Sequence, residues 1–372
     1  MPENNNETAT KESLMDTSAF TNTTLVKETD QTFIPFPKAK LFNPEGDDEV
    51  TSRQMIGGNS TNILQLNNVR YKWALQLKKT MYANHWLPEK NSLQSDRFTE
   101  LTGDQKDTFV GILSFLIFLD SIQTANVPNI ADYITAPEVK ILLAIQTFQE
   151  AVHSDSYQYI IESLIPRDMR DGIYDKWRDD PVLFERNKFI AQQFQDFLDA
   201  PTEMGFKRVI MANYILESIY FYNGFQFFYL LASQGLMTGT SRVIKLINKD
   251  ELTHVTLFRN IIGDIFTEDD HEWAREMMGQ AVEQEVTWAN HVIGSRILGM
   301  SNESHEHYTK HLANRRLVAL KMKPLYEGVE SNPYKHLEER ADMEGGGNAK
   351  GGFFTDSASY NQSNAVGGFD RF

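Results

Sequence analysis

Apolar and polar positions repeat with helical spacing through most of the chain. Between Asn62 and about His85, side chains such as Leu66, Trp73 and Leu77 recur every three or four residues, which predicts a first long helix. No stretch alternates apolar and polar residues with the period of a strand. The pattern therefore predicts an all-α fold, a helical bundle with additional helices. Further helices are expected near residues 102–123, 137–165, 182–198, 206–235, 242–254, 272–298 and 303–322.

Two of these helix starts have the spacing of a capping box. Thr102 is followed three positions later by Gln, and Thr135 is followed three positions later by Glu, directly before a long apolar segment. Four charged residues, Arg167, Asp168, Arg170 and Asp171, follow a proline, which indicates a polar connection between helices.

Composition divides the chain into three parts. Residues 1–58 are rich in Asn, Thr, Glu, Asp and Pro, and we expect a flexible N-terminal arm that docks locally through FIPFPKAKLF. Residues 59–325 carry the helical patterns and form the expected helical domain. Residues 326–372 include Gly- and Asn-rich runs with isolated aromatic residues, which predicts a mostly disordered tail.

The segment TFQEAVHSDSYQY, residues 147–159, places three reactive side chains on one helix face. Glu150 and His153 are one turn apart, and Tyr157 lies one turn further along. The segment before them is apolar almost all round, which is typical of a helix in a protein core. A carboxylate in such surroundings is costly unless a cation or another partner compensates its charge. Spacing and context together favour metal binding.

Two more Glu-x-x-His pairs occur in the chain, and they differ in context. Glu251 and His254 follow apolar positions at helical spacing in VIKLINKDELTH, which again favours a metal site. Glu268 and His271 lie in the acidic stretch TEDDHEW, which indicates a solvated helix start.

Four predicted core helices therefore each supply possible metal ligands, because Asp120 and Glu217 are acids in two other apolar helices. One carboxylate from each of two helices, with Glu-x-x-His from each of two others, is the arrangement of ferritin-like dimetal proteins. Zinc prefers fewer ligands with more nitrogen or sulfur, so this set favours two iron or manganese ions. The predicted ligands are Asp120, Glu150, His153, Glu217, Glu251 and His254.

Charge and composition exclude several classes of function. A formal net charge of −15 argues against general nucleic-acid binding, which requires a basic surface. The chain has no cysteine, which excludes disulfides, zinc–thiolate sites, iron–sulfur clusters and a thiol nucleophile. The N-terminus lacks the features of a signal peptide, so we expect a cytoplasmic protein. The uncharged run Ser218 to Ser241 contains Asn and Gln and favours a buried helix over a membrane span.

Tyr157 would determine what an oxidising dimetal site does. A buried tyrosine is more often a core residue whose hydroxyl has a partner. This one lies one turn beyond a ligand histidine, and Phe221, Phe225 and Ile247 can surround it. A phenol in an apolar, water-poor pocket beside two metal ions is suited to holding a long-lived radical.

Together these motifs resemble the small, radical-generating beta subunit of class I ribonucleotide reductase, from about Trp86 to Arg316. The resemblance rests on LDSIQ, QEAVHSDSY, LESIYFY and KDELTH, which contain the predicted ligands in the same order and spacing. It implies a ribonucleoside-diphosphate reductase subunit with two iron ions per chain, or manganese, activated by dioxygen or another oxidant. Tyr157 is then the radical tyrosine, and Phe221, Phe225 and Ile247 form its apolar surroundings.

The resemblance also implies a route by which the radical leaves the metal site. Trp86 and Asp250 match positions that form, with His153, a hydrogen-bonded path in this family. Tyr360, in SASYNQ, resembles the mobile tyrosine that passes the radical to the large (alpha) subunit, and the last residues resemble its docking tail. In this family the nucleotide and the reducing thiols belong to the large subunit. A homodimer is implied, and an activating flavoprotein is a further candidate partner.

Two other functions remain open on the residues alone. A related ligand-binding dimetal oxidase would need a ligand-sized tunnel and has no use for the linked Trp86, Asp250 and Tyr360. A ferritin-like storage protein would need no radical tyrosine and would assemble into a large shell. We expect the radical-generating subunit. The metal stays open, because WLPEK is similar to manganese-using members and LDSIQ to iron-using ones.

Overall fold

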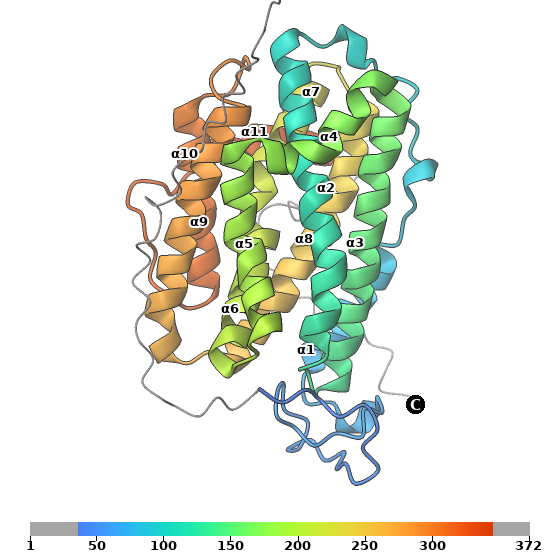
Figure 1. The fold of residues 1–372 in the computed structure, drawn as a ribbon, viewed down its shortest axis with the longest axis vertical. Coiled ribbons are helices and arrows are strands. Elements are labelled where there is room, and N and C mark those ends of the chain that lie inside the picture. The colour runs from blue at the N-terminus through green and yellow to red at the C-terminus, as the bar shows by residue number, and fades with distance from the viewer. Residues whose placement is uncertain (1–35, 345–372) are drawn as a thin grey trace, which may run out of the picture. The chain divides into compact units, whose positions relative to one another are not determined.

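The computed structural model describes residues 36–344, and within this range the chain is helical and contains no strand (Figure 1). The all-α prediction is confirmed. The helices are α1 (Lys72–Ala83), α2 (Gly103–Ala131), α3 (Pro137–Leu164), α4 (Arg167–Asp179), α5 (Pro181–Asp199), α6 (Glu203–Ile215), α7 (Tyr222–Ser233), α8 (Thr238–Ile265), α9 (His271–Val292), α10 (Asn302–Ala319) and α11 (Lys335–Glu344).

The centre of the bundle consists of α2, α3, α8 and the segment that runs from α6 to α7. α2 and α3 pack side by side along most of their lengths, and α8 packs against α3, α6 and α7 (Figure 1). α4 and α5 cover α2, while α9 packs on α5 and α10 on α9. By length and composition α2 could cross a membrane, but 61% of its most apolar stretch is buried in the bundle. That burial is typical of the core helix of a helical bundle.

Helix starts depend on partners that are distant in the sequence. The capping box at Thr102 is confirmed, since its hydroxyl accepts a hydrogen bond from the backbone of Gln105 at 3.2 Å. The capping box predicted at Thr135 is wrong. The Thr135 hydroxyl donates to the Gln54 carbonyl at 2.7 Å, and Glu138 accepts from the backbone N–H of Tyr71 at 3.1 Å. These two side chains therefore attach earlier segments to the start of α3.

Three other predictions about the helices are also wrong. The first helix begins at Lys72 rather than near Asn62, and residues 66–68 form a separate short turn of 3₁₀-helix. Residues 167–171 begin helix α4 and are not a connection. The long apolar helix expected over residues 206–235 is interrupted by a π-helical turn, Leu216–Tyr220, between α6 and α7.

The described part of the N-terminal arm, residues 36–58, has no helix but is attached to the bundle. Phe36 stacks on Tyr133 with ring centroids 5.4 Å apart. The described part of FIPFPKAKLF, residues 36–42, therefore docks on the bundle through Phe36, as expected. Arg53 is fully buried and pairs with Asp48 at 3.1 Å and with Glu138 at 3.7 Å. The prediction of a flexible arm stays untested for residues 1–35, which lie outside the described range.

Helix α11 lies within residues 326–372, where we expected a mostly disordered tail. It packs against α7, and its Glu338 is 6% exposed. The Glu338 carboxylate accepts hydrogen bonds from the Tyr308 hydroxyl at 2.8 Å, the Gln226 amide at 2.9 Å and the Asn332 amide at 2.8 Å. The prediction of a mostly disordered tail over residues 326–372 is therefore wrong for residues 335–344, and residues 345–372 lie outside the described range.

We expect the docking of α11 to weaken as the pH rises towards 7. Burial raises the pKa of Glu338 from 4.5 to about 7, so the docked helix binds a proton that the detached helix releases between these values. The docked state is thus most stable below pH 4.5 and loses this contribution through pH 7. Amide hydrogen exchange in α11, corrected for intrinsic rates, should show protection falling by about thirtyfold between pH 5.5 and 8.

Glu338→Gln should remove this pH dependence, because the amide has no charge to titrate. Glu339→Gln is the matched control, since Glu339 is the exposed neighbouring residue on the same helix. The same pH dependence in wild type and Glu338→Gln would contradict the assignment.

Candidate metal centre

The six predicted ligands come from four neighbouring segments of the bundle and are all fully buried. α2 supplies one, α3 and α8 each supply a Glu-x-x-His pair, and the π-helical turn supplies one. They are Asp120, Glu150, His153, Glu217, Glu251 and His254, each with 0% exposure. Helical spacing accounts for the two pairs, because residues three apart lie on the same face.

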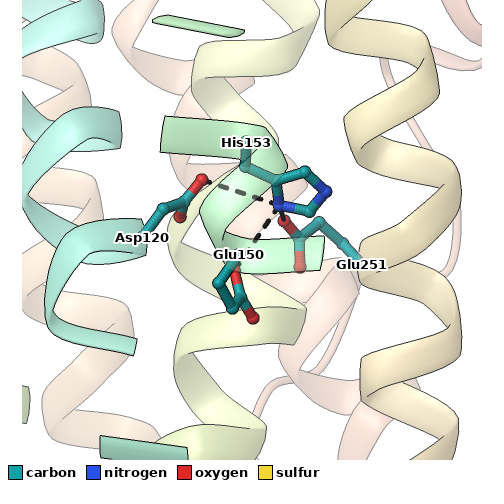
Figure 2. A group of neighbouring side chains, drawn as sticks. All are labelled: Asp120, Glu150, His153 and Glu251. Carbon is teal, nitrogen blue, oxygen red and sulfur yellow. Dashed lines mark ion pairs between the residues drawn. The ribbon is translucent and has the colours of Figure 1, made fainter. Parts of the chain in front are cut away.

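The structure brings these side chains together as two overlapping groups. The first ligand group is Asp120, Glu150, His153 and Glu251, and the second ligand group is Glu150, Glu217, Glu251 and His254. Within each group the possible ligand atoms lie within 4.8 Å of one another. Glu150 and Glu251 belong to both groups, so each of them could supply a ligand atom to either of two ions. Figure 2 shows the first group, with its side chains converging from α2, α3 and α8.

Both histidines direct the same ring nitrogen into the cluster. His153 Nδ1 lies 3.1 Å from Glu251, 3.5 Å from Glu150 and 3.7 Å from Asp120 (Figure 2). His254 Nδ1 lies 2.8 Å from Glu251, 3.3 Å from Glu150 and 3.5 Å from Glu217. The two imidazoles therefore occupy equivalent positions, one in each ligand group.

The donor set fits a pair of divalent cations. Within residues 36–344, several of its buried atoms have no hydrogen-bond partner: both carboxylate oxygens of Asp120, Oε2 of Glu150, Nδ1 of His153, Oε2 of Glu217 and Oε1 of Glu251. Four carboxylates in a water-free interior repel one another unless protons or cations compensate them. Oxygen-rich ligation with one imidazole in each group suits iron or manganese better than zinc.

The pKa shifts in this cluster have a common origin. Burial, followed by the charge of Glu150, raises the pKa of Asp120 and Glu217 well above the usual carboxyl range and that of Glu251 to about 8. Burial alone would also raise the pKa of Glu150, but His254 and His153 outweigh it and lower the pKa. Without metal the cluster therefore holds protons, which bound cations would replace.

The outer nitrogens of the two histidines have partners of their own. His153 Nε2 lies 3.3 Å from Oδ2 of Asp250, and the Trp86 indole N–H donates to the same oxygen at 2.9 Å. The Trp86 and His153 rings are stacked with centroids 6.2 Å apart. His254 Nε2 lies 3.0 Å from the side-chain oxygen of Gln149. An outer acceptor keeps the proton on Nε2 and leaves Nδ1 free to bind metal.

Three glutamines around the ligands were not predicted from the sequence. The amides of Gln123 and Gln146 both donate to Oε1 of Glu217, at 2.5 and 2.9 Å, and Gln149 contacts His254. A sequence signal was present, because Gln123 lies three residues after Asp120 and Gln146 four residues before Glu150. Polar residues at same-face spacing from predicted ligands are thus candidates for supporting them.

Tyr157 lies on α3 one turn beyond His153 and is fully buried. Its hydroxyl has no hydrogen bond of normal geometry with any described residue. Burial, and then the charges of Asp120 and Glu251, raise the pKa of Tyr157 well above its usual value. The phenol is therefore neutral and sits close enough to the cluster to be affected by its carboxylates.

The remaining predicted residues have different outcomes. Phe221, Phe225 and Ile247 are fully buried. The Phe221 and Phe225 rings stack with centroids 5.8 Å apart. The role of these three residues as the surroundings of Tyr157 stays a prediction. Tyr360 lies outside the described residues. The pair at Glu268 lies at the start of α9, as predicted, and belongs to neither ligand group.

Comparisons with known proteins identify the family. The family model "Ribonucleotide reductase, small chain" matches residues 63–333. The chain belongs to this family. The ribonucleoside-diphosphate reductase subunit beta of Treponema pallidum is 42% identical over 302 residues, which cover 79% of this chain and 86% of that protein. The protein of the same name from Halalkalibacterium halodurans is 36% identical over 344 residues, or 90% of this chain and 98% of that one.

A solved structure agrees with this membership. The ribonucleotide reductase R2 subunit from Clostridium botulinum is 46% identical in sequence and superposes with a TM-score of 0.80, covering 83% of this chain and 99% of that chain. The resemblance predicted from the sequence is confirmed, and so is the ferritin-like bundle. The chain is a small (beta) subunit of ribonucleoside-diphosphate reductase, an oxidoreductase that makes deoxyribonucleotides from ribonucleotides.

Proposed function

We propose that the two ligand groups hold two metal ions and that this centre converts Tyr157 into a stable radical, which drives ribonucleotide reduction in the large subunit. The observation that carries the proposal is the position of Tyr157. It is a fully buried phenol one helical turn from His153, its hydroxyl makes no hydrogen bond of normal geometry with a described residue, and it is influenced by the Asp120 carboxyl. Two iron ions per chain, with manganese as the alternative, and dioxygen or another oxidant are the proposed cofactors.

The protein's own residues perform three tasks in this proposal. The bound ions supply one-electron oxidising power, while the two Glu-x-x-His pairs hold them at fixed positions. Tyr157 keeps its proton until it is oxidised, because its pKa is raised well above its usual value. On losing an electron a phenol becomes strongly acidic, and Asp120 is the carboxyl whose charge has the largest effect on the pKa of Tyr157. The burial of Tyr157 keeps water and reductants away from the radical.

The route for the radical begins at the outer side of His153. Asp250 Oδ2 lies between His153 Nε2 at 3.3 Å and the Trp86 indole nitrogen at 2.9 Å, so a continuous hydrogen-bonded path leads away from the ligands. Trp86 is half-buried and can exchange an electron with a group outside the bundle. In this proposal Tyr360 and the C-terminal tail continue the route to the large subunit. A homodimer, an activating flavoprotein and a cytoplasmic location belong to the same proposal.

Metal reconstitution followed by electron paramagnetic resonance tests the proposal. The metal-free full chain is loaded with iron(II) or manganese(II), exposed to air or to an activating oxidant, and assayed for metal content, radical signal and turnover with the large subunit. We expect about two metal ions per chain and a tyrosyl signal with at least one of the metals. If two ions bind and no tyrosyl radical forms with either metal under any activation, the ligand-binding oxidase becomes the better explanation.

Matched histidine variants assign the metal to the proposed ligands. His254→Ala should lose metal, since it removes an imidazole from the second ligand group. His271→Ala should keep both ions, because this histidine belongs to a Glu-x-x-His pair outside the two groups.

A further inference from the structure

Gln149 connects the two halves of the metal centre from outside the ligands. It precedes Glu150 on α3 and is 4% exposed. Its side-chain nitrogen donates to Oδ1 of Asp250 at 3.0 Å, and its side-chain oxygen lies 3.0 Å from Nε2 of His254. One amide thus contacts both the histidine of the second ligand group and the carboxylate behind the histidine of the first.

The chemistry of the neighbours fixes the orientation of this amide. His254 directs Nδ1 into the ligand cluster, so its proton is on Nε2 and requires an acceptor outside the cluster. The carboxylate of Asp250 can only accept, so it requires a donor. Gln149 satisfies both demands in one orientation, with oxygen towards His254 and nitrogen towards Asp250. Rotating the amide by half a turn would place its N–H group against the N–H of His254 and its oxygen against the Asp250 carboxylate.

The partners of Asp250 are divided between its two oxygens. Oδ2 accepts from the Trp86 indole and lies beside His153 Nε2, while Oδ1 has Gln149 as its partner among the described residues. Loss of the Gln149 amide would leave Oδ1 buried without a donor, and the carboxylate would be free to rotate away from His153 and Trp86. The same loss would remove the outer acceptor of His254.

We propose that Gln149 is a positioning residue that orients His254 for metal binding and holds Asp250 in line with His153 and Trp86. The outer sides of both ligand histidines then end in one hydrogen-bonded network that runs from His254 through Gln149 to Asp250. The part of this inference that concerns Asp250 rests on the proposed function, in which Asp250 conducts the radical. The part that concerns His254 involves only metal affinity.

Manganese(II) titration of metal-free protein tests the first half without any oxidised enzyme. Free manganese(II) gives a strong paramagnetic resonance signal, so bound and free ions are counted directly. Gln149→Leu has nearly the same volume and neither hydrogen bond. We expect it to weaken one of the two bound ions by about 10–100-fold, the usual cost of losing an outer partner of a metal ligand, and to change the other less. Gln158→Leu, at an exposed position of α3, should bind both ions as wild type does.

Gln149→Glu separates the two contacts and guards against a folding defect in the leucine variant. Its carboxylate still accepts from His254, but in the ionised form it repels the Asp250 carboxylate instead of donating to it. We expect manganese affinity within about threefold of wild type, with turnover in the presence of the large subunit reduced at least tenfold at equal radical content. Unchanged affinity in Gln149→Leu, affinity in Gln149→Glu as weak as in the leucine variant, or full turnover in Gln149→Glu would each overturn the proposal.

The outcomes also separate this inference from the function on which it rests. If wild type binds two ions but never forms a tyrosyl radical, the proposed function fails, while the manganese titrations still decide the role of Gln149 in metal binding. If the radical forms in wild type and the variants bind metal as wild type does, the proposed function stands and the inference fails.

Discussion

Tyr157→Phe is expected to abolish the tyrosyl radical and to reduce turnover with the large subunit by about a thousandfold or more, while metal content stays unchanged. The variant keeps the aromatic ring but has no hydroxyl proton to lose. Tyr157 is not among the six ligands, so both ligand groups stay intact. Paramagnetic resonance, metal analysis and a turnover assay on the same preparation measure the three quantities together.

The same substitution should not destabilise the fold. The Tyr157 hydroxyl is buried and makes no hydrogen bond of normal geometry with a described residue, although it interacts with the Asp120 carboxyl. Removing it therefore costs little and relieves a desolvated polar group. We expect a midpoint of thermal unfolding equal to or slightly above that of metal-free wild type. Tyr222→Phe is a stringent control, because Tyr222 also has a buried hydroxyl without a described partner. It should keep the radical, and a radical that persists in Tyr157→Phe would contradict the assignment of Tyr157.

The metal ligands could be predicted because their signal is local. Glu150 with His153 and Glu251 with His254 lie one helical turn apart, so the sequence alone places each pair on one face. Carboxylates in apolar helices have few explanations, and four such helices have only a small number of ways to converge. The structure brings all six predicted ligands together in two groups, as these patterns imply.

The π-helical turn that carries Glu217 could not be predicted, because its stability depends on distant side chains. A widened turn leaves backbone carbonyls without their usual helical partners. Here the Arg186 guanidinium donates to the Tyr220 carbonyl at 2.6 Å, and Arg316 donates to the Ser218 carbonyl at 3.4 Å. These arginines lie 34 and 98 residues away in the sequence, so no local pattern reveals them.

The cap at the start of α8 could not be predicted either, because its partner is distant in the sequence. The first backbone N–H groups of this helix are capped by Asp96, which accepts from Gly239 at 2.8 Å and from Thr240 at 2.7 Å. Asp96 is 143 residues before Gly239, so the partner is set by packing and not by capping-box spacing. Spacing identifies candidates for local hydrogen bonds, whereas the partner that is used depends on which segments the core brings together.

Trp86→Phe should separate formation of the radical from its use. Phenylalanine keeps an aromatic ring beside His153 but lacks the indole N–H that donates to Asp250 at 2.9 Å. Trp86 belongs to neither ligand group, so radical content should stay within about twofold of wild type. Turnover with the large subunit should fall by about 10²–10⁴-fold.

Trp73→Phe is the matched control, because Trp73 is another half-buried tryptophan and packs instead against Tyr71. It should leave both radical content and turnover near wild type. Equal loss of radical and turnover in Trp86→Phe would assign Trp86 to assembly of the metal centre. Retained turnover would remove it from the route altogether, and Asp250 would then serve only to orient His153. A selective loss of turnover links the hydrogen bond between Trp86 and Asp250 to movement of the radical out of the bundle.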